Sequence, residues 1–437
     1  MKIRGIAAIA GLALAVTSLA ACGGGTDNGG GGDASGTGDG ASTEGVNLTF
    51  QSLSDQPAAI AAVKGIVDTW NADHPDIQVE IVPAGWDGIY DKLITQFNGG
   101  SAPDIIHYEA ASIIPFAADG YLADLTDLID PDLQSDVSQG IWDSVTVDGQ
   151  VIAVPTELQS YMVFANKGLL DAAGVEVPTG DNMTWDQFRE IAQATTTNGV
   201  YGVGWGLKSP TATMMSLALG FDGGYFDGTG LDVTIDVGDD ELAVPVAIHQ
   251  MAYDDQSILP VTLTQSGSEV LASFYAGQVA MTVQGSFQAA NMAVDAPADL
   301  DWVVLPPLEG SAGATQSANP QTLSVNIDSA NVEAAAQFVN FFASTDNLVA
   351  LNRADALIPP STSAQEAMAA ELGSENGWDM ILGSGKVLES APFLFVNNYT
   401  QWKDTVATPA FQRYLANEID ETELQAQLTD GWDQIGG

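Results

Sequence analysis

The sequence predicts an α/β protein in which a mostly parallel sheet is covered by helices. The first observation is that apolar residues within 47–108 switch repeatedly between the two-residue period of a strand and the 3.6-residue period of a helix. The second is their order of strand, helix, strand, helix, strand, since short right-handed crossovers turn that order into a parallel sheet. The third is the length of 437 residues, which is enough for two lobes.

The stretch from 47 to 108 predicts each of these elements. Ser54 or Asp55 is expected to cap the first helix, whose first turn contains Pro57. The second helix is expected to begin at Trp86 and to end before the Gly99-Gly100 pair. The expected strands cover 47–51, 76–82 and 103–108, and the expected helices cover about 57–70 and 86–97.

The remainder of the chain continues the alternation without an internal repeat or a second membrane-spanning segment. Further strands are expected within "AMTVQ" and "TLSVNI". The tryptophans in helical patterns are expected in the core, namely Trp70, Trp185, Trp402 and Trp432. Further helices are expected at about 185–195, 242–254, 332–344 and 421–435.

The N-terminus has the layout of an exported lipoprotein. Lys2 and Arg4 precede a short apolar run that ends in small residues, as in a secretory signal over 1–21. The motif "LAAC" resembles the bacterial lipobox, so we expect a lipid anchor on Cys22 and an extracytoplasmic location at the cell membrane. Residues 22–45 are rich in Gly, Asp and Ser and are expected to form a disordered leash.

Composition excludes several other classes of protein. The chain has 11 Lys and Arg against 57 Asp and Glu, a net charge of −46, which repels nucleic acid and anionic lipid headgroups. A single cysteine excludes a disulfide framework and a thiolate metal site. The histidines, His74, His107 and His249, lack the spacing of metal ligands. We therefore expect no metal, no cofactor and no nucleic-acid partner, and we expect a monomer.

Five motifs, in this order along residues 46–437, carry a family resemblance. They are "FNGGSAPDII", "DGYLADLTDLI", "VPTELQSYMVFANKGLLDAAGV" with "TWDQF" downstream, "FYAGQVAMTVQGSF" and "SANVEAAAQFVNFFAS". Together they resemble the family 1 extracellular solute-binding proteins of ABC importers, which are carbohydrate-binding and maltose-binding-protein-like.

The resemblance implies a periplasmic-binding-protein-like fold, with two α/β lobes, three crossover segments and a ligand cleft between the lobes. It also implies a function without catalysis: the chain would capture a mono- or oligosaccharide by hinge closure and deliver it to the transmembrane subunits of an ABC permease. The crossings are expected near 155–161, 317–321 and 359–363. The expected N-terminal lobe comprises 46–156 and 319–361, and the expected C-terminal lobe comprises 157–318 and 362–437.

The resemblance also implies positions for ligand contacts. Phe287 matches the stacking aromatic of the family, which is usually tryptophan, and Tyr108 with Glu109 follows the third strand. For Tyr108 the alternative is a role in the sheet core. Ala111 and Ser112 stand where many relatives carry an Asp-Arg style pair, which is a departure from the family pattern.

The first crossing and the strand ends supply the other candidates. Gln159 falls where the family often has an acidic hydrogen-bonding residue, and Glu157, just before it, is alternatively a hinge carboxylate in water. Thr211 and Thr213 match a cleft loop. A sugar site needs aromatic faces and hydrogen-bonding side chains. On that ground the second choices near strand ends and crossings are Trp86, Gln51, Ser54, Asp55, Asn319, Gln321 and Phe395.

Two other functions remain open at this point. One is a receptor for a cationic solute such as a polyamine, because the chain is rich in carboxylates. The other is an exported glycoside hydrolase that uses two carboxylates, for which Glu109 and Glu157 are imaginable. Neither residue lies in a catalytic motif, and no nucleophile-elbow pattern is present.

Overall fold

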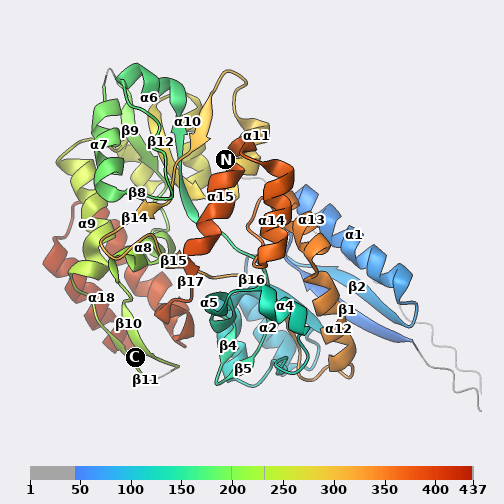
Figure 1. Ribbon diagram of the computed structural model, residues 1–437. Coiled ribbons are helices and arrows are strands. Elements are labelled where there is room, and N and C mark those ends of the chain that lie inside the picture. The colour runs from blue at the N-terminus through green and yellow to red at the C-terminus, as the bar shows by residue number, and fades with distance from the viewer. Residues whose placement is uncertain (1–44, 198, 231, 436–437) are drawn as a thin grey trace, which may run out of the picture. The chain divides into compact units, whose positions relative to one another are not determined.

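The computed structural model describes residues 45–197, 199–230 and 232–435 (Figure 1). The expected signal peptide, the lipid anchor on Cys22 and nearly all of the leash lie outside the described residues. Among the helices that are described, none is long and apolar enough to cross a membrane.

The first lobe is built on a five-stranded sheet with the order β2-β1-β3-β16-β6. β1 pairs in parallel with β2 and β3, whereas β16 runs antiparallel to both of its neighbours. The strands are β1 Val46–Ser52, β2 Ile77–Pro83, β3 Ile105–Glu109, β6 Val154–Glu157 and β16 Gln321–Val325. The accompanying elements are α1 Pro57–Asp73, α2 Ile89–Asn98, α3 Ala110–Ala118, α4 Pro131–Asp136, α5 Gln139–Asp143, the hairpin of β4 Thr146–Val147 and β5 Gln150–Val151, α12 Val332–Phe342 and α13 Thr345–Asp355.

The second lobe is built on a four-stranded sheet with the order β13-β7-β12-β9. β12 pairs in parallel with β9, and β7 runs antiparallel to β12 and β13. The strands are β7 Tyr161–Asn166, β9 Tyr201–Trp205, β12 Val279–Gly285 and β13 Trp302–Val304. The helices are α6 Lys167–Ala173, α7 Trp185–Thr195, α8 Thr211–Ala218, α9 Asp239–Tyr253, α10 Gly267–Tyr275, α11 Gln288–Asp295, α15 Trp378–Ser384, α16 Tyr399–Trp402, α17 Thr408–Leu415 and α18 Glu421–Ile435.

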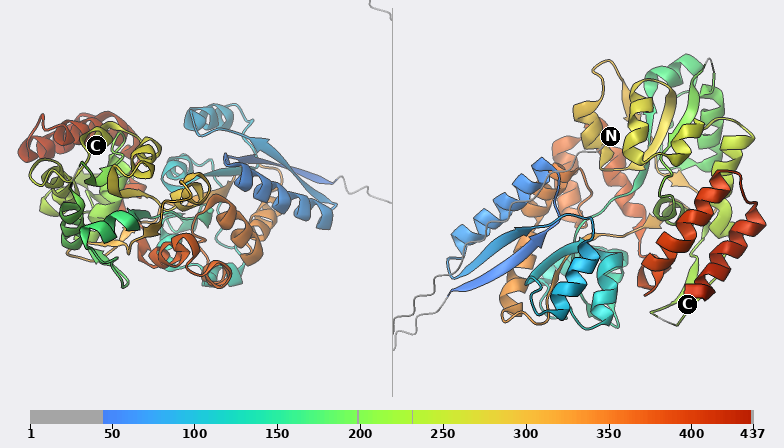
Figure 2. Two further views of the ribbon diagram at one scale, coloured as in Figure 1. Left: turned by 90° about the horizontal axis from the view of Figure 1, so that it is seen from above. Right: turned by 180° about the vertical axis from the view of Figure 1, so that it is seen from behind.

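Short strand pairs complete the second lobe. They are β10 Phe226–Thr229 with β11 Asp232–Ile235, β14 Leu308–Glu309 with β8 Met183–Thr184, and β15 Gln316–Ser317 with β17 Leu388–Glu389. Seen from behind, the N-terminal strands and the C-terminal helices lie on opposite sides of the described part (Figure 2).

The sheets are mostly parallel, as expected, and one strand in each large sheet runs against the others. β16 and β7 are these two strands, and each is reached directly from the other lobe. Such a strand begins at the edge where its neighbours end, so it must run in the opposite direction. The two-lobed α/β class itself is confirmed.

The cap of the first helix and the start of the second helix lie further along the chain than the sequence indicates. Pro57 occupies the first turn of α1, so Gln56 is the N-cap, and Ser54 and Asp55 fall outside the helix. α2 begins at Ile89 after Gly88, whose φ of 69° ends the preceding turn. The expected cap at Ser54 or Asp55 and the expected start at Trp86 were therefore wrong, and both corrections leave these side chains in loops beyond strand ends.

Each lobe has an aromatic core. In the first lobe, the Phe50 ring lies 5.8 Å from that of Phe338 and 5.7 Å from that of Phe342. In the second lobe, the Trp185 and Trp205 rings stack at 6.1 Å. The expected core tryptophans are confirmed, since the following are all buried: Trp70, Trp185, Trp402 and Trp432.

The segments between the lobes bond to one another. Residues 158–160 connect β6 to β7, and residues 318–320 connect β15 to β16. Leu158 exchanges two backbone hydrogen bonds of 2.8 Å with Ile358, which follows α13. The Ser160 hydroxyl lies 2.6 Å from that of Ser384 on α15. These contacts hold the first crossing against the segment that follows α13 and against α15.

The helix α14 Thr362–Leu372 lies where the third crossing was expected. At its start, the Ser363 N–H donates to Asp136 of the first lobe at 3.0 Å. After it, Gly377 lies against Val304 of the second lobe. Contacts with the first lobe therefore extend slightly beyond the expected boundary at 361.

Gly202 permits β9 to approach α7, and its substitution tests this packing. A Cβ at residue 202 would lie 2.1 Å from the carbonyl oxygen of Ala192, which is backbone and cannot rotate away. Gly202→Ala should therefore lower the free energy of unfolding by about 1–3 kcal/mol, measured by urea denaturation. Gly65→Ala is the control, because nothing lies within 4 Å of that exposed position in α1. The control should gain about 0.5–1 kcal/mol, and equal effects of the two substitutions would contradict this account.

Candidate functional site

Strand ends from both sheets define the candidate site. Gln321, the first residue of β16, pairs with Glu109 at the end of β3 and with Glu157 at the end of β6. In the second lobe, Tyr161 at the start of β7 pairs with Gly285 at the end of β12. Open α/β sheets bind ligands beyond the carboxyl ends of their strands, so this edge is the place to look for a site.

A cavity of about 190 Å³ lies at this edge. It combines loops of the first lobe with Gln159 of the first crossing and Phe287 of the second lobe. A larger cavity of about 490 Å³ lies within the second lobe alone, away from the strand ends. The lining of the smaller cavity consists of Leu53, Ser54, Asp55, Gln56, Trp86, His107, Gln159, Phe287, Gln321, Asp355 and Leu357.

His107 fixes the orientation of Gln321. The backbone N–H of Leu53 donates to His107 Nδ1 at 3.1 Å, so the ring proton must be on Nε2. Nε2 then donates to Gln321 Oε1 at 2.5 Å, which leaves the amide nitrogen of Gln321 as the group with free donors. Burial lowers the pKa of His107 to about 4, with the Gln321 bond opposing this, so the ring is neutral at physiological pH.

Two aromatic rings line the cavity from different lobes. Phe287 directly precedes α11, and its ring covers Gly285, where a Cβ would lie 2.5 Å from Cε1. Trp86 meets His107 edge to face at 5.9 Å and lies 6.1 Å from the ring of Tyr108. Both rings are partly exposed, so their faces are available for stacking against apolar C–H surfaces.

Two carboxyl groups line the cavity. Asp55 and Asp355 line it, and Asp355 forms a side-chain hydrogen bond with Glu157. Burial raises the pKa of Glu157 well above its ordinary value, and nearby Asp355 raises it further. Burial also raises the pKa of Asp355 to about 6, with Asp55 adding to the effect. Glu157 is only 1% exposed, so burial favours its protonated form beside Asp355.

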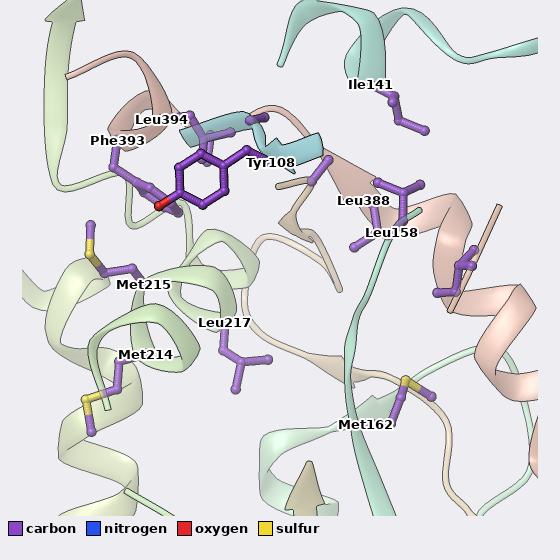
Figure 3. Close-up of a cluster of buried hydrophobic side chains, with 14 of the residues drawn as sticks. Tyr108, Ile141, Leu158, Met162, Met214, Met215, Leu217, Leu388, Phe393 and Leu394 are labelled. Atoms are coloured by element: carbon purple, nitrogen blue, oxygen red, sulfur yellow. The ribbon is translucent and has the colours of Figure 1, made fainter. Parts of the chain in front are cut away.

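Tyr108 lies outside the lining, in a packed cluster. It is 8% exposed, and Figure 3 shows its ring beside Phe393 and Leu394 of the second lobe, near Met215. Successive residues of a strand point to opposite faces, so Tyr108 does not share the face of His107. The structure thus places Tyr108 in a packed cluster that includes residues of both lobes.

Glu109 belongs to a second polar cluster. Its two carboxylate oxygens accept hydrogen bonds from Ser112 Oγ at 2.8 Å and Asn319 Nδ2 at 3.1 Å. Asn319 Oδ1 in turn accepts from the Ala111 N–H at 3.0 Å. Ala111 and Ser112, the departures from the family pattern, therefore hold Asn319 and Glu109 in place.

The other predicted residues also lie outside the lining. Gln51 is fully buried, and its side-chain nitrogen and oxygen have no partner among the described residues. Thr211 Oγ1 lies 2.7 Å from Thr408 Oγ1, and Thr213 hydrogen-bonds the hydroxyl of Tyr161. Phe395 is half-buried in the 3₁₀ turn Pro392–Phe395. The predicted residues that the structure brings together are therefore Ser54, Asp55, Trp86, Gln159, Phe287 and Gln321.

Sequence reasoning missed His107 and Asp355. His107 lies within the motif "PDIIHY", but only a metal role was considered for it. Asp355 ends α13 outside any of the matched motifs, and nothing in the sequence signals that Glu157 would contact it. Within the described residues, no group of three or more His, Cys, Asp and Glu is placed to hold a metal ion.

The arrangement provides stacking and hydrogen bonding for a polar ligand with apolar faces. The carboxylates that were weighed for hydrolysis, Glu109 and Glu157, both lie outside the lining and are engaged with other side chains. A glycosidase needs its two carboxyl groups on either side of a bound substrate. The two carboxylates that were weighed for hydrolysis therefore do not flank this cavity.

Comparisons with known proteins identify the family. Residues 54–348 match the family model described as bacterial extracellular solute-binding protein. An uncharacterized lipoprotein in the oleD 5' region of Streptomyces antibioticus is 38% identical over 379 residues, 86% of this chain and 84% of that protein. The diacetylchitobiose binding protein DasA of Streptomyces coelicolor is 26% identical over 216 residues, 47% of each chain.

A solved structure shares the fold over almost the whole described part. The GacH receptor of Streptomyces glaucescens GLA.O has a TM-score of 0.74 at 23% identity, covering 90% of this chain and 98% of the receptor. That receptor was crystallised unliganded and in complex with acarbose and an acarbose homolog.

The buried acid pair predicts an unusual dependence of stability on pH. A carboxyl group with a raised pKa in the folded state stabilises the fold fully below its unfolded pKa of roughly 4. That contribution is lost as pH rises toward the folded pKa, which for Asp355 is about 6 and for Glu157 is also raised. Glu157→Gln keeps a donor to Asp355 but cannot ionise, so it should raise Tm more at pH 7 than at pH 4.5. Equal changes of Tm at the two pH values would contradict the assignment.

Proposed function

The chain belongs to the bacterial extracellular solute-binding proteins, and we propose that it is the sugar receptor of an ABC importer. It captures a mono- or oligosaccharide outside the cytoplasmic membrane and delivers it to the transmembrane subunits of a permease. The single observation that supports a sugar is the cavity in which Phe287 and Trp86, from different lobes, are combined with the amides Gln159 and Gln321.

Sugar recognition follows from these side chains. The aromatic faces stack on the C–H surfaces of a pyranose ring, and the amides bond its hydroxyl groups. The locked orientation of Gln321 provides N–H donors, which pair with hydroxyl oxygens. The remaining predicted contacts, Ser54 and Asp55, accept hydrogen bonds from other hydroxyl groups of the sugar.

Closure of the two lobes accompanies binding. The lobes are joined by short crossings, so a ligand that contacts Phe287 and Trp86 together stabilises the arrangement that holds them close. The proposed lobes comprise 46–156 with 319–361 and 157–318 with 362–437. The protein acts as a monomer and without catalysis, and the lipid on Cys22 anchors it to the cell membrane.

A ligand screen tests the receptor function. The purified full-length protein is heated with glucose, maltose, N,N'-diacetylchitobiose and arabinooligosaccharides, because a ligand that binds only the folded state raises Tm. At least one sugar should raise Tm and be recovered unchanged after prolonged incubation. The absence of any shift across the panel would contradict the receptor function, and recovery of a cleaved product would contradict the lack of catalysis.

Truncation of Phe287 separates a binding role from a packing role. Phe287→Ala removes stacking area in the cavity, so it should weaken binding of the sugar by about 1–3 kcal/mol in calorimetry, with little change of Tm. Tyr108→Ala is the comparison, since Tyr108 is packed in the core and its truncation should cost about 3–5 kcal/mol of stability. A Phe287→Ala protein that binds as tightly as the unmodified protein would remove Phe287 from the site.

Substitution of Cys22 tests the lipid anchor. In cells, Cys22→Ser should release the protein from the membrane fraction or leave its signal peptide attached, because only the thiol accepts the lipid. Fractionation by ultracentrifugation and the intact mass provide the measurement. Unchanged fractionation and mass would contradict the anchor and leave the sugar-binding proposal unaffected.

A further inference from the structure

We propose that Ser384, the last residue of α15, is a positioning residue for the sugar site. It acts through Ser160 and Ser286, and all three serines lie outside the cavity lining. The residues that they hold in place are the lining residues Gln159 and Phe287. This role rests on the proposed sugar-binding function, and it fixes the shape of one wall of the site before a sugar binds.

The side chains of Gln159 and Phe287 meet at one point of the cavity wall. A Cβ at Gly285 would lie 2.5 Å from Cε1 of Phe287 and 3.5 Å from Oε1 of Gln159. The amide and the aromatic ring therefore lie close together above Gly285. A sugar that stacks on the ring and bonds to the amide needs a fixed separation between these two groups, so their relative position affects its affinity.

Each of these two side chains is next to a buried serine in the sequence. Gln159 precedes Ser160 in the first crossing, and Phe287 follows the serine that comes directly after β12. The Ser286 N–H donates to the carbonyl oxygen of Ser160 at 2.8 Å, and the Ser160 N–H donates to Ser286 Oγ at 3.3 Å. Neither serine is more than 1% exposed. Two buried hydrogen bonds thus join the backbone beside the amide to the backbone beside the ring.

Ser384 holds this pair through a chain of hydroxyl groups. Its Oγ donates to the carbonyl oxygen of Ile381 at 2.6 Å, and a hydroxyl group has only one proton to donate. Ser160 Oγ lies 2.6 Å from Ser384 Oγ, so Ser160 is the donor of that bond. Ser384 is fully buried, and its truncation therefore removes the acceptor of a buried proton. The first crossing then loses its bond to α15.

The helix that carries Ser384 is packed closely at both of its ends. Before α15, a Cβ at Gly377 would overlap Cγ2 of Val304 on β13. After α15, a Cβ at Gly385 would lie 3.0 Å from Cγ2 of Ile358, in the segment that pairs with the first crossing. Close contacts on both sides leave the helix little freedom to shift, so Ser384 is a rigid support for the crossing.

A positioning role and a purely structural role make different predictions. Ser384 fixes the separation between the amide and the ring, so its effect on binding disappears once the amide is removed. A purely structural hydroxyl affects binding to the same extent with and without the amide, because the effects of independent sites add.

Titration calorimetry on the full chain with maltose and with N,N'-diacetylchitobiose measures this difference. Ser384→Ala should weaken binding of these probes roughly fivefold, which corresponds to the loss of one hydrogen bond. In the Gln159→Ala background, the same substitution should change the affinity by less than about twofold. Ser160→Ala removes the donor and leaves Ser384 bonded to Ile381, so it should reproduce the loss of affinity even if Ser384→Ala does not fold.

Ser257→Ala is the matched control. Ser257 is also fully buried in the second lobe, and its Oγ donates to the carbonyl oxygen of Met251 at 3.1 Å, away from the cavity lining. Its truncation removes a hydrogen bond of the same kind. It should therefore lower Tm and leave the affinity for both sugars unchanged.

A fluorine probe tests the arrangement without any sugar. With 4-fluorophenylalanine in place of Phe287, the otherwise unmodified protein should give a single sharp ¹⁹F NMR line for this ring. Ser384→Ala should shift or broaden that line, because the ring is no longer held in one place. Ser257→Ala should leave the line unchanged.

The outcomes separate the two levels of the proposal. An unchanged affinity or an unchanged fluorine line in Ser384→Ala would overturn the positioning role and leave the sugar receptor intact, and so would an equal loss of affinity with and without the Gln159 amide. Binding of neither sugar by the unmodified protein would count against the sugar receptor. The fluorine line would then decide by itself whether Ser384 positions Phe287.

Discussion

The direction of two strands is the constraint on which the rest of the structure depends. β16 and β7 each enter a sheet from the other lobe, so they start at the edge where the neighbouring strands finish. This arrangement gathers the ends of β3, β6 and β12 at one place. It also keeps the connections between lobes very short, which limits how far the lobes can separate.

The same edge contains a pair of buried acids. Glu157 lies directly before Leu158, whose backbone pairs with Ile358, and Asp355 lies directly before that partner segment. The acid pair therefore joins two segments that already share backbone hydrogen bonds. Asn352 strengthens the junction by donating to the carbonyl of Thr156 at 2.9 Å. A buried acid is unfavourable in itself, and such compromises are expected where function, rather than stability, determines the residue.

The sequence was informative about the order of strands and helices along the chain. It was much less informative about which distant side chains contact each other. Periodicity located the strands and helices of residues 47–108, and the motifs identified the family, which the comparisons confirm. Phe287 could be predicted as a candidate because it lies between a strand and a helix. It therefore does not belong to the buried face of a helix. Asp355 was not, because its role arises from a contact with Glu157, almost two hundred residues earlier in the chain. Tyr108 was ambiguous because strand alternation alone does not say which face meets the other lobe.

Gly285 has a consequence for comparisons among relatives. The ring of Phe287 rests directly above a residue without a side chain, and a single methyl group there would occupy the position of the ring edge. A relative with identical lining residues but alanine at the position of Gly285 would have to present its aromatic plane at another angle. Ligand preference in such proteins can therefore diverge through a residue that never touches the ligand, so two cavities with the same inventory of side chains need not accept the same molecule.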